Sequence, residues 1–157
     1  MKFDHYRMLK EHALAMCVED GAALPPTKQI HPIVLAYVGD IVFSMYTRLR
    51  LVPTSNKVQV LHDIDAKMVS AVMQAKAMVV LEQELDEEEL QVYHRGRNAK
   101  STVPKSASVA QYRMATGFEA LLGFLFLENH EERLEYVLDK SFGIIAKELQ
   151  EAFAKTK

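Results

Sequence analysis

Two carboxylates interrupt the most apolar stretches of this chain, and they restrict how it can fold more than any other feature. From Ile33 to Phe43 every residue is apolar except Gly39 and Asp40. The apolar segment from Val109 to Leu127 carries Glu119 near its middle. A carboxylate inside an apolar helix costs several kcal/mol unless a charged or hydrogen-bonding group meets it. Each of the two acids therefore requires a partner, which can be a basic side chain, a backbone N–H group or a metal ion.

The spacing of the apolar residues predicts an all-α protein, because it follows the helical period in every long segment. A chain of 157 residues suits one domain with a single sizeable core. We expect residues 1–27 to form a helical N-terminal extension and residues 28–157 to form the main domain. The pattern predicts six to seven helices, at 3–19, 32–52, 57–84 with a break near Asp63, 87–94, 108–129, and from 131 into the C-terminal tail.

Composition argues for a cytoplasmic protein without a membrane partner. The net charge of −2 creates no overall field that attracts nucleic acid, so such binding would need a local basic patch. Cys17 is the single cysteine, which excludes an intramolecular disulfide and fits a reducing compartment. Once the two core carboxylates are counted, no apolar run reaches the roughly 20 residues that span a bilayer.

The two carboxylates can share one metal ion if their helices cross. Gly39 directly precedes Asp40, and Gly123 lies on the same helical face as Glu119. These small residues would allow the two helices to approach each other closely. Asp40 and Glu119 would then hold one divalent cation. Oxygen ligands of this kind suit Mg²⁺ or Mn²⁺, which are usually held by one or two carboxylates together with waters and substrate phosphates.

Two other interpretations stay open at the level of pattern. Each carboxylate could pair with a basic residue, such as Arg48 or Arg113. The adjacent His62 and Asp63 could belong to a metal-dependent phosphohydrolase of the HD type. That dipeptide is a weak signal, and a helix-capping role for Asp63 explains it better.

The segment from Arg95 to Ala107 is predicted to be irregular, because turn and loop residues fill it. It contains no acidic residue, and its side chains and glycine suit phosphate contacts. The alternative is an ordinary solvated loop that balances the acidic run at 82–89. Its four basic residues are Arg95, Arg97, Lys100 and Lys105.

Two motifs resemble the signatures of the ribonuclease III family. Residues 35–40 read LAYVGD and resemble the family pattern LEFLGD, and residues 115–123 read ATGFEALLG and resemble A-D-x-F-E-A-L-x-G. Both occur in the family's order, which is more specific than either motif alone. The sequence RGRNAK at 95–100, followed by Pro104-Lys105 and Tyr112-Arg113, resembles Mini-ribonuclease III, the compact bacterial branch without a double-stranded-RNA-binding domain.

The resemblance implies a homodimeric endonuclease domain at residues 28–157 that hydrolyses double-stranded RNA with Mg²⁺. In the Mini branch the implied substrate is the precursor of large-subunit (23S) ribosomal RNA, and a ribosomal protein helper is a partner that the resemblance leaves open. Asp40 falls on the catalytic aspartate and Glu119 on the metal-binding glutamate, so both are catalytic and metal-binding candidates. The RNA-binding candidates are Arg95, Arg97, Asn98, Lys100, Lys105, Tyr112 and Arg113.

The chain departs from the family pattern at a few positions. Full-length ribonucleases III carry carboxylates where this chain has Ala36 and Thr116; the Mini branch shares these replacements, which put a two-metal site in doubt. Asp63 and Ile64 follow His62 where the branch tends to carry basic residues, which would weaken one RNA contact. A non-catalytic RNA-binding module on the same fold is the alternative function, and the two retained carboxylates argue against it.

Overall fold

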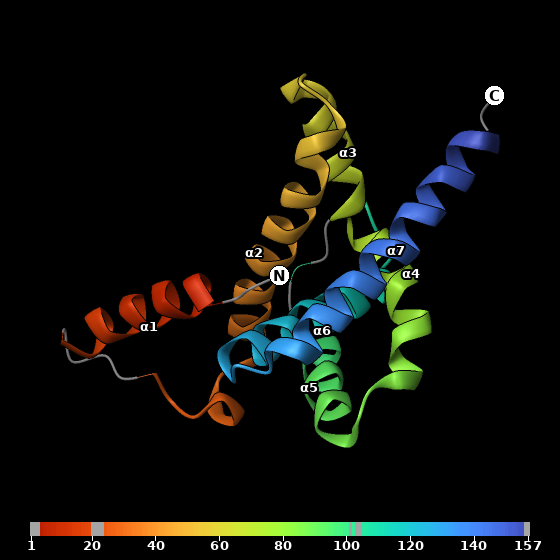
Figure 1. Cartoon of the computed structure of the whole chain (residues 1–157). Helices are drawn as coiled ribbons and strands as arrows, with labels where there is room; N and C mark the ends of the chain where they lie inside the picture. Colours follow the sequence, from red (N-terminus) through yellow and green to blue (C-terminus); the bar gives the residue numbers. More distant parts are fainter. Residues whose placement is uncertain (1–3, 20–23, 101, 103–104, 156–157) are drawn as a thin grey trace.

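The computed structural model describes residues 4–19, 24–100, 102 and 105–155, and all regular structure in these ranges is helical. The side chains at 4–6 and 17–19 lie outside the description. The all-α prediction is therefore confirmed for the described part of the chain. The described residues form seven α-helices (Figure 1): α1 (Asp4–Glu19), α2 (Pro32–Leu51), α3 (Val58–Met68), α4 (Ala71–Leu81), α5 (Glu87–Asn98), α6 (Val109–Leu127) and α7 (Glu131–Lys155).

Helix α6 is the centre of the structure, and α2, α4, α5 and α7 pack around it. Its side chains are apolar on nearly every side, and Phe118, Leu121 and Leu122 are fully buried. Phe118 meets Phe43 of α2 in an edge-to-face contact with 5.1 Å between the ring centroids. A helix that is apolar all round is stable only when neighbours cover its faces, as they do here for most of the stretch from Ala115 to Leu125.

Helices α2 and α6 cross in backbone contact at two glycines. A Cβ atom on Gly39 would overlap the carbonyl oxygen of Glu119, and one on Gly123 would overlap the carbonyl oxygen of Leu35. Only glycine permits an approach this close between two helix backbones. The crossing that these two glycines would allow is therefore present, and it brings the α2 backbone directly against Glu119.

The predicted irregular segment is wrong at its start, because α5 continues as a helix to Asn98. Gly96 is buried, and a Cβ atom there would lie 2.7 Å from Cβ of Ala120 and 2.9 Å from Cα of Gly117. The glycine read as a loop residue is thus the contact point of a second close helix crossing, between α5 and α6. Local composition could not reveal this, because tertiary packing rather than propensity keeps the segment helical.

The break predicted near Asp63 lies further along the chain. Asp63 is inside α3 and accepts a hydrogen bond of 2.9 Å from Nε2 of Gln59, so the capping role expected for it is wrong. The chain turns at Ser70, whose Oγ accepts a hydrogen bond from the backbone N–H of Met73 and caps α4. Serine is a favoured N-cap, and its signal was hidden inside an otherwise continuous helical pattern.

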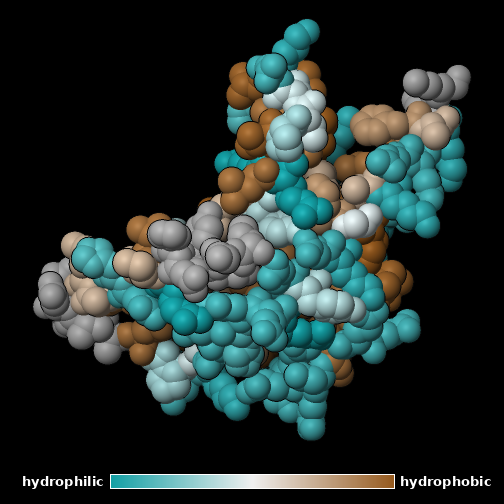
Figure 2. Space-filling view, viewed as in Figure 1, coloured by the Kyte–Doolittle hydropathy of each residue, from teal (hydrophilic) through white to brown (hydrophobic). Residues whose placement is uncertain are grey.

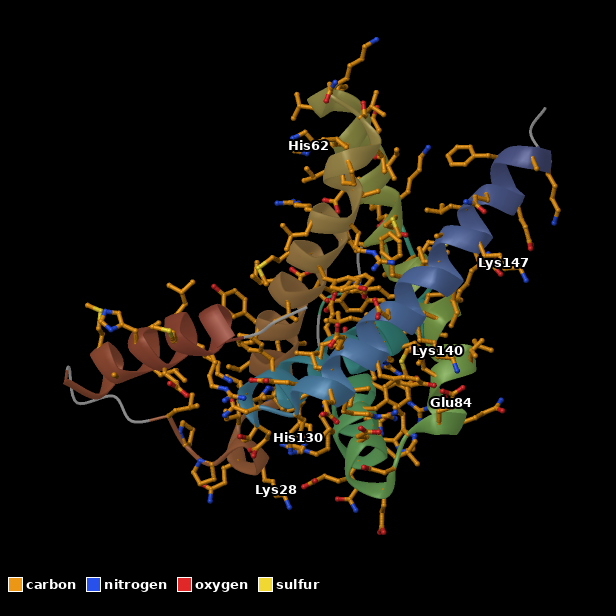
Figure 3. The ribbon with its side chains drawn as sticks, in the orientation of Figure 1. Lys28, His62, Glu84, His130, Lys140 and Lys147 are labelled. Atoms are coloured by element: carbon orange, nitrogen blue, oxygen red, sulfur yellow. The ribbon has the colours of Figure 1, made fainter. Side chains whose placement is uncertain are left out.

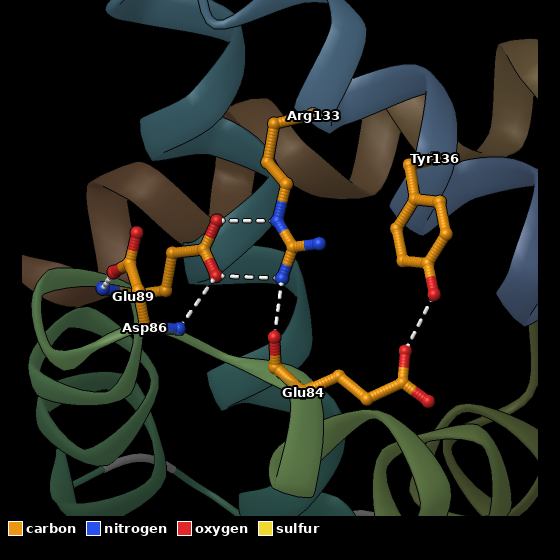
Figure 4. A network of polar contacts seen from close by, with 5 residues as sticks. All are labelled: Glu84, Asp86, Glu89, Arg133 and Tyr136. Atoms are coloured by element: carbon orange, nitrogen blue, oxygen red, sulfur yellow. Dashed lines mark hydrogen bonds and ion pairs between the residues drawn. The ribbon is translucent and has the colours of Figure 1, made fainter.

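A polar network fastens α7 to the turn before α5 (Figures 3 and 4). Glu89 is only 3% exposed and completes a capping box with Asp86. Arg133 donates to both carboxylate oxygens of Glu89, from Nε at 2.7 Å and from Nη2 at 2.8 Å. Glu84 pairs with Lys140 and accepts a hydrogen bond of 2.6 Å from the Tyr136 hydroxyl. Two acids of the run at 82–89, Glu84 and Glu89, are therefore neutralised by α7.

Apolar side chains remain exposed on α1 and α2. Leu9 and Met16 are exposed, and Arg7 ties α1 to Glu131 with an ion pair of 2.5 Å. Hydrophobic atoms also gather along the projecting part of α2 and α3 in Figure 2. By length and composition the segment Pro32–Thr54 could cross a membrane, contrary to the sequence analysis, although core helices of soluble proteins pass the same test.

Replacing Gly39 or Gly123 with alanine should force α2 and α6 apart. Overpacking a close contact of this kind typically costs about 1–3 kcal/mol, which urea denaturation of each variant will measure. Gly143 in α7 is the matched control, because nothing lies within 4 Å of a Cβ atom placed on it. Gly143→Ala should raise stability by roughly 0.5–1 kcal/mol, since alanine is the better helix former. Equal effects at the three positions would contradict the close crossing.

Candidate active site

A cleft of about 260 Å³ lies between the first half of α2 and the first half of α6. Both carboxylates line it, so the crossing of the two helices brings together the two acids that the sequence singled out. Ala36 and Thr116, the positions where full-length ribonucleases III carry acids, line the same cleft. The Thr116 hydroxyl donates a hydrogen bond of 3.0 Å to the carbonyl oxygen of Tyr112. The cleft is lined by Ile33, Ala36, Tyr37, Asp40, Tyr112, Thr116 and Glu119.

Asp40 is exposed, which corrects the expectation that it is a core residue. The apolar run around it has an outward stripe, because Val34, Tyr37 and Ile41 are all exposed and lie three or four residues apart. Asp40 borders this stripe while its neighbour Gly39 faces α6. Partial desolvation raises the pKa of Asp40, and the positive charge of Arg48 acts in the opposite direction.

Glu119 is the more enclosed of the two acids and is only partly exposed. Desolvation and the nearby negative charge of Asp40 raise the pKa of Glu119 to about 7, while a hydrogen bond from the Gln74 side chain lowers it. Two carboxylates that repel each other across one cleft form a site that a cation would stabilise.

Gln74 is a site residue that the sequence analysis missed. It lies on α4, is fully buried, and its amide contacts Glu119. The signal was available, because Gln74 interrupts the apolar helix Ala71–Leu81 much as the two acids interrupt theirs. A glutamine in an apolar helix is a weaker sequence signal than a carboxylate, because burying an amide costs less free energy.

The alternative partners expected from pattern do not form. Arg48 pairs with Asp65 at 2.9 Å, and Arg113 is exposed on α6. No ion pair among the described residues involves Asp40 or Glu119. An HD-type centre is also unsupported. The part of the chain that the structure describes holds no cluster of three or more His, Cys, Asp or Glu side chains that could bind a metal, and His62 and His130 lie far apart (Figure 3).

Arg95 makes contacts within the protein. Its guanidinium donates hydrogen bonds to the backbone carbonyl oxygens of Lys28 at 3.1 Å and Ile30 at 3.0 Å. It therefore anchors α5 to the segment that leads into α2. Arg97 lies 3.9 Å from Glu82 and stacks over the Tyr93 ring at 5.8 Å. Of the basic residues in this segment, Arg97 is the one in contact with the acidic run.

The remaining RNA-binding candidates lie at or beyond the end of α5. Asn98 is the last residue of α5 and is exposed, as are Lys100, Lys105 and Arg113. Pro104, part of the motif that resembles the Mini branch, lies outside the described residues. Tyr112 lines the cleft with Glu119, so this candidate lies next to the carboxylates.

The raised pKa of Glu119 predicts how stability depends on pH. Between its ordinary pKa of 4.5 and about 7, only the folded state binds the proton, so stability should fall as the pH rises through this window. Glu119→Gln removes the titration. One pKa unit corresponds to about 1.4 kcal/mol. The free energy of unfolding of Glu119→Gln, relative to that of wild type, should therefore rise by roughly 2–3 kcal/mol between pH 5 and pH 8 in metal-free buffer. Urea unfolding measures this difference. Glu132→Gln, at an exposed position of α7, is the control and should follow wild type at both pH values.

The sequence matches known proteins over most of its length. The family profile described as the ribonuclease III domain matches residues 33–130. A Mini-ribonuclease 3 from Thermoanaerobacter sp. is 45% identical over 118 residues, which cover 74% of this chain and 83% of that protein. A Mini-ribonuclease 3 from Staphylococcus aureus is 43% identical over 122 residues, which cover 75% of this chain and 91% of that protein.

The fold also matches a solved structure. A crystal structure of a protein from Fusobacterium nucleatum superposes with a TM-score of 0.67 at 26% sequence identity, covering 71% of this chain and 90% of the other. The sequence matches, the fold and the cleft with its two carboxylates therefore all point to the same family. The chain belongs to the ribonuclease III family of double-stranded-RNA endoribonucleases, within its Mini-ribonuclease 3 group.

Proposed function

We propose that this endoribonuclease uses Mg²⁺ at the cleft between α2 and α6 to cut double-stranded RNA, and that it matures the 23S ribosomal RNA precursor in the cytoplasm. The observation that carries the proposal is the meeting of Asp40 and Glu119 in one cleft. The catalytic and metal-binding roles of both acids follow from their positions in the two family motifs. Residues 28–157 form the catalytic domain in this proposal, and residues 1–27 form an extension.

The residues of the cleft fit a single divalent cation. Asp40 and Glu119 line the same cleft, and the charge of Asp40 raises the pKa of Glu119. Mg²⁺ or Mn²⁺ is commonly held by one or two carboxylates with waters and phosphates. Ala36 and Thr116 supply no further charge, which favours one ion over two. When bound, the metal would polarise the scissile phosphate and lower the pKa of a water molecule.

The protein's own side chains account for binding and orientation of the RNA. The A-form duplex is read through phosphates and 2′-hydroxyls, because its major groove is too deep and narrow for side chains. Tyr112 lines the cleft, and a phenol there can donate a hydrogen bond to either group. Lys100, Lys105 and Arg113 are exposed and suit the flanking phosphates.

A homodimer completes the proposal, because one cleft cuts one strand and a two-fold pair of clefts can cut both. The supporting observation is the apolar stripe of Val34, Tyr37 and Ile41, of which Tyr37 is 75% exposed. Tyr37 also lines the cleft, so the stripe and the site adjoin. Burying such a stripe against a second copy would remove a large apolar area from water.

Asp40→Asn should abolish cleavage and keep RNA binding, because the amide keeps the shape of the side chain and removes its charge. We expect the cleavage rate of duplex RNA with Mg²⁺ to fall by roughly 10²–10⁴-fold, the range that a positioned catalytic group contributes. Asp139→Asn, at an exposed aspartate of α7, is the matched control and should cut as wild type does. Undiminished cleavage by Asp40→Asn would overturn the catalytic assignment. A wild-type protein that binds the duplex without cutting it would instead favour a binding module.

The exposed basic residues should contribute to RNA binding through salt-sensitive phosphate contacts. On the Asp40→Asn background, replacing Lys100, Lys105 and Arg113 with alanine should weaken binding to every duplex by a similar factor. The slope of log K against log salt should flatten by roughly 0.7–0.9 per contact removed, a range measured for DNA. Arg95→Ala is the control: it loses the backbone contacts that anchor α5, so it should lower stability and leave the slope unchanged. An unchanged slope in the triple variant would contradict this RNA-binding surface.

A further inference from the structure

Gln74 occupies a position where the fold alone would favour an apolar side chain. It lies on α4 among Ala75, Ala77 and Met78, all buried, and is itself 0% exposed. Its Oε1 atom is buried and has no hydrogen-bond partner among the described residues. A buried polar atom left unpaired costs free energy, and each such atom in a native structure requires an explanation. Neither packing nor stability explains why a glutamine with an unpaired oxygen occupies this position.

A hydrogen bond to the backbone just after α3 fixes the orientation of the Gln74 amide. Its Nε2 atom donates a hydrogen bond of 3.2 Å to the carbonyl oxygen of Val69, the residue that directly follows α3. Since a carbonyl oxygen accepts and cannot donate, this contact requires the nitrogen on that side. An amide nitrogen carries two hydrogens, so one remains for a second acceptor.

The second contact of the amide reaches the candidate site. The Gln74 side chain also lies within hydrogen-bonding reach of the Glu119 carboxylate on α6. Gln74 thus links the α3–α4 corner to the more enclosed of the two candidate metal ligands.

We propose that Gln74 is a positioning residue: its buried amide, held by the Val69 carbonyl, orients the Glu119 carboxylate and so strengthens divalent-cation binding in the cleft. The inference rests on the proposed metal site and adds a residue that the two family motifs do not contain. Hydrogen-bond partners behind a metal ligand restrict its orientation, and losing one typically costs about 10–100-fold in metal affinity. In this proposal the amide lies where it can orient Glu119, and the unpaired Oε1 atom is the cost of that position in stability.

The test measures Mn²⁺ binding to the full-length, metal-stripped protein at pH 8, from the loss of the free Mn²⁺ signal in electron paramagnetic resonance. Gln74→Met keeps the length of the side chain and removes the amide, and Gln74→Leu is a second variant of the same kind. Both should bind Mn²⁺ roughly 10–100-fold more weakly than wild type, with a melting temperature in EDTA that equals or exceeds the wild-type value. In cleavage assays the Mg²⁺ concentration for half-maximal rate should rise, while the rate at saturating Mg²⁺ changes little.

Ser70→Ala is the matched control at the same corner. It removes the cap of α4 without touching Glu119, so it should lower the melting temperature and leave Mn²⁺ affinity unchanged. Wild-type Mn²⁺ affinity in Gln74→Met and Gln74→Leu would overturn the inference. So would a loss of folding in both variants, because the amide would then serve the fold. Failure of wild type to bind Mn²⁺ more tightly than Glu119→Gln would instead overturn the metal site, and this inference with it.

Discussion

The backbone contact between α2 and α6 is the constraint on which the rest of the structure depends. Gly39 and Gly123 let the two helices touch without side chains between them, and Glu119 supplies one of the carbonyl groups at the contact. Asp40 follows Gly39 directly in the chain, so the same crossing that closes the core sets the two carboxylates on one cleft. Stability and function meet at this point, because any change that separates the helices also separates the acids.

Electrostatics in the cleft oppose the fold and favour a ligand. The raised pKa of Glu119 reports that its negative charge is poorly solvated and repelled by Asp40. Elsewhere the enclosed acids are well paired: Glu89 with Arg133, and Asp65 with Thr47 and Arg48. The contrast separates the acids that stabilise the fold from Asp40 and Glu119, which we propose bind a cation. A fold that pairs its structural acids this thoroughly gives the two exceptions functional meaning.

The basic segment at 95–105 divides into a structural half within α5 and an exposed half beyond it. Arg95 and Gly96 belong to the packing of α5, through backbone carbonyls on one side and α6 on the other. Lys100 and Lys105 lie beyond the helix and are exposed. A run of similar residues in the sequence thus serves two purposes, and the helix end at Asn98 is the boundary between them.

The sequence by itself determined the helical class and singled out the pair Asp40 and Glu119, because periodicity and misplaced charge are local signals. Only the tertiary structure decided that Asp40 is exposed, that Gly96 is helical, and that Gln74 reaches Glu119. Each of these depends on which face of a helix meets a neighbour, and that is set by contacts between residues distant in the chain. The sequence of a single helix does not show which of its apolar faces a neighbour will cover. The exposed stripe of α2 therefore could not be distinguished from core residues without the position of α6.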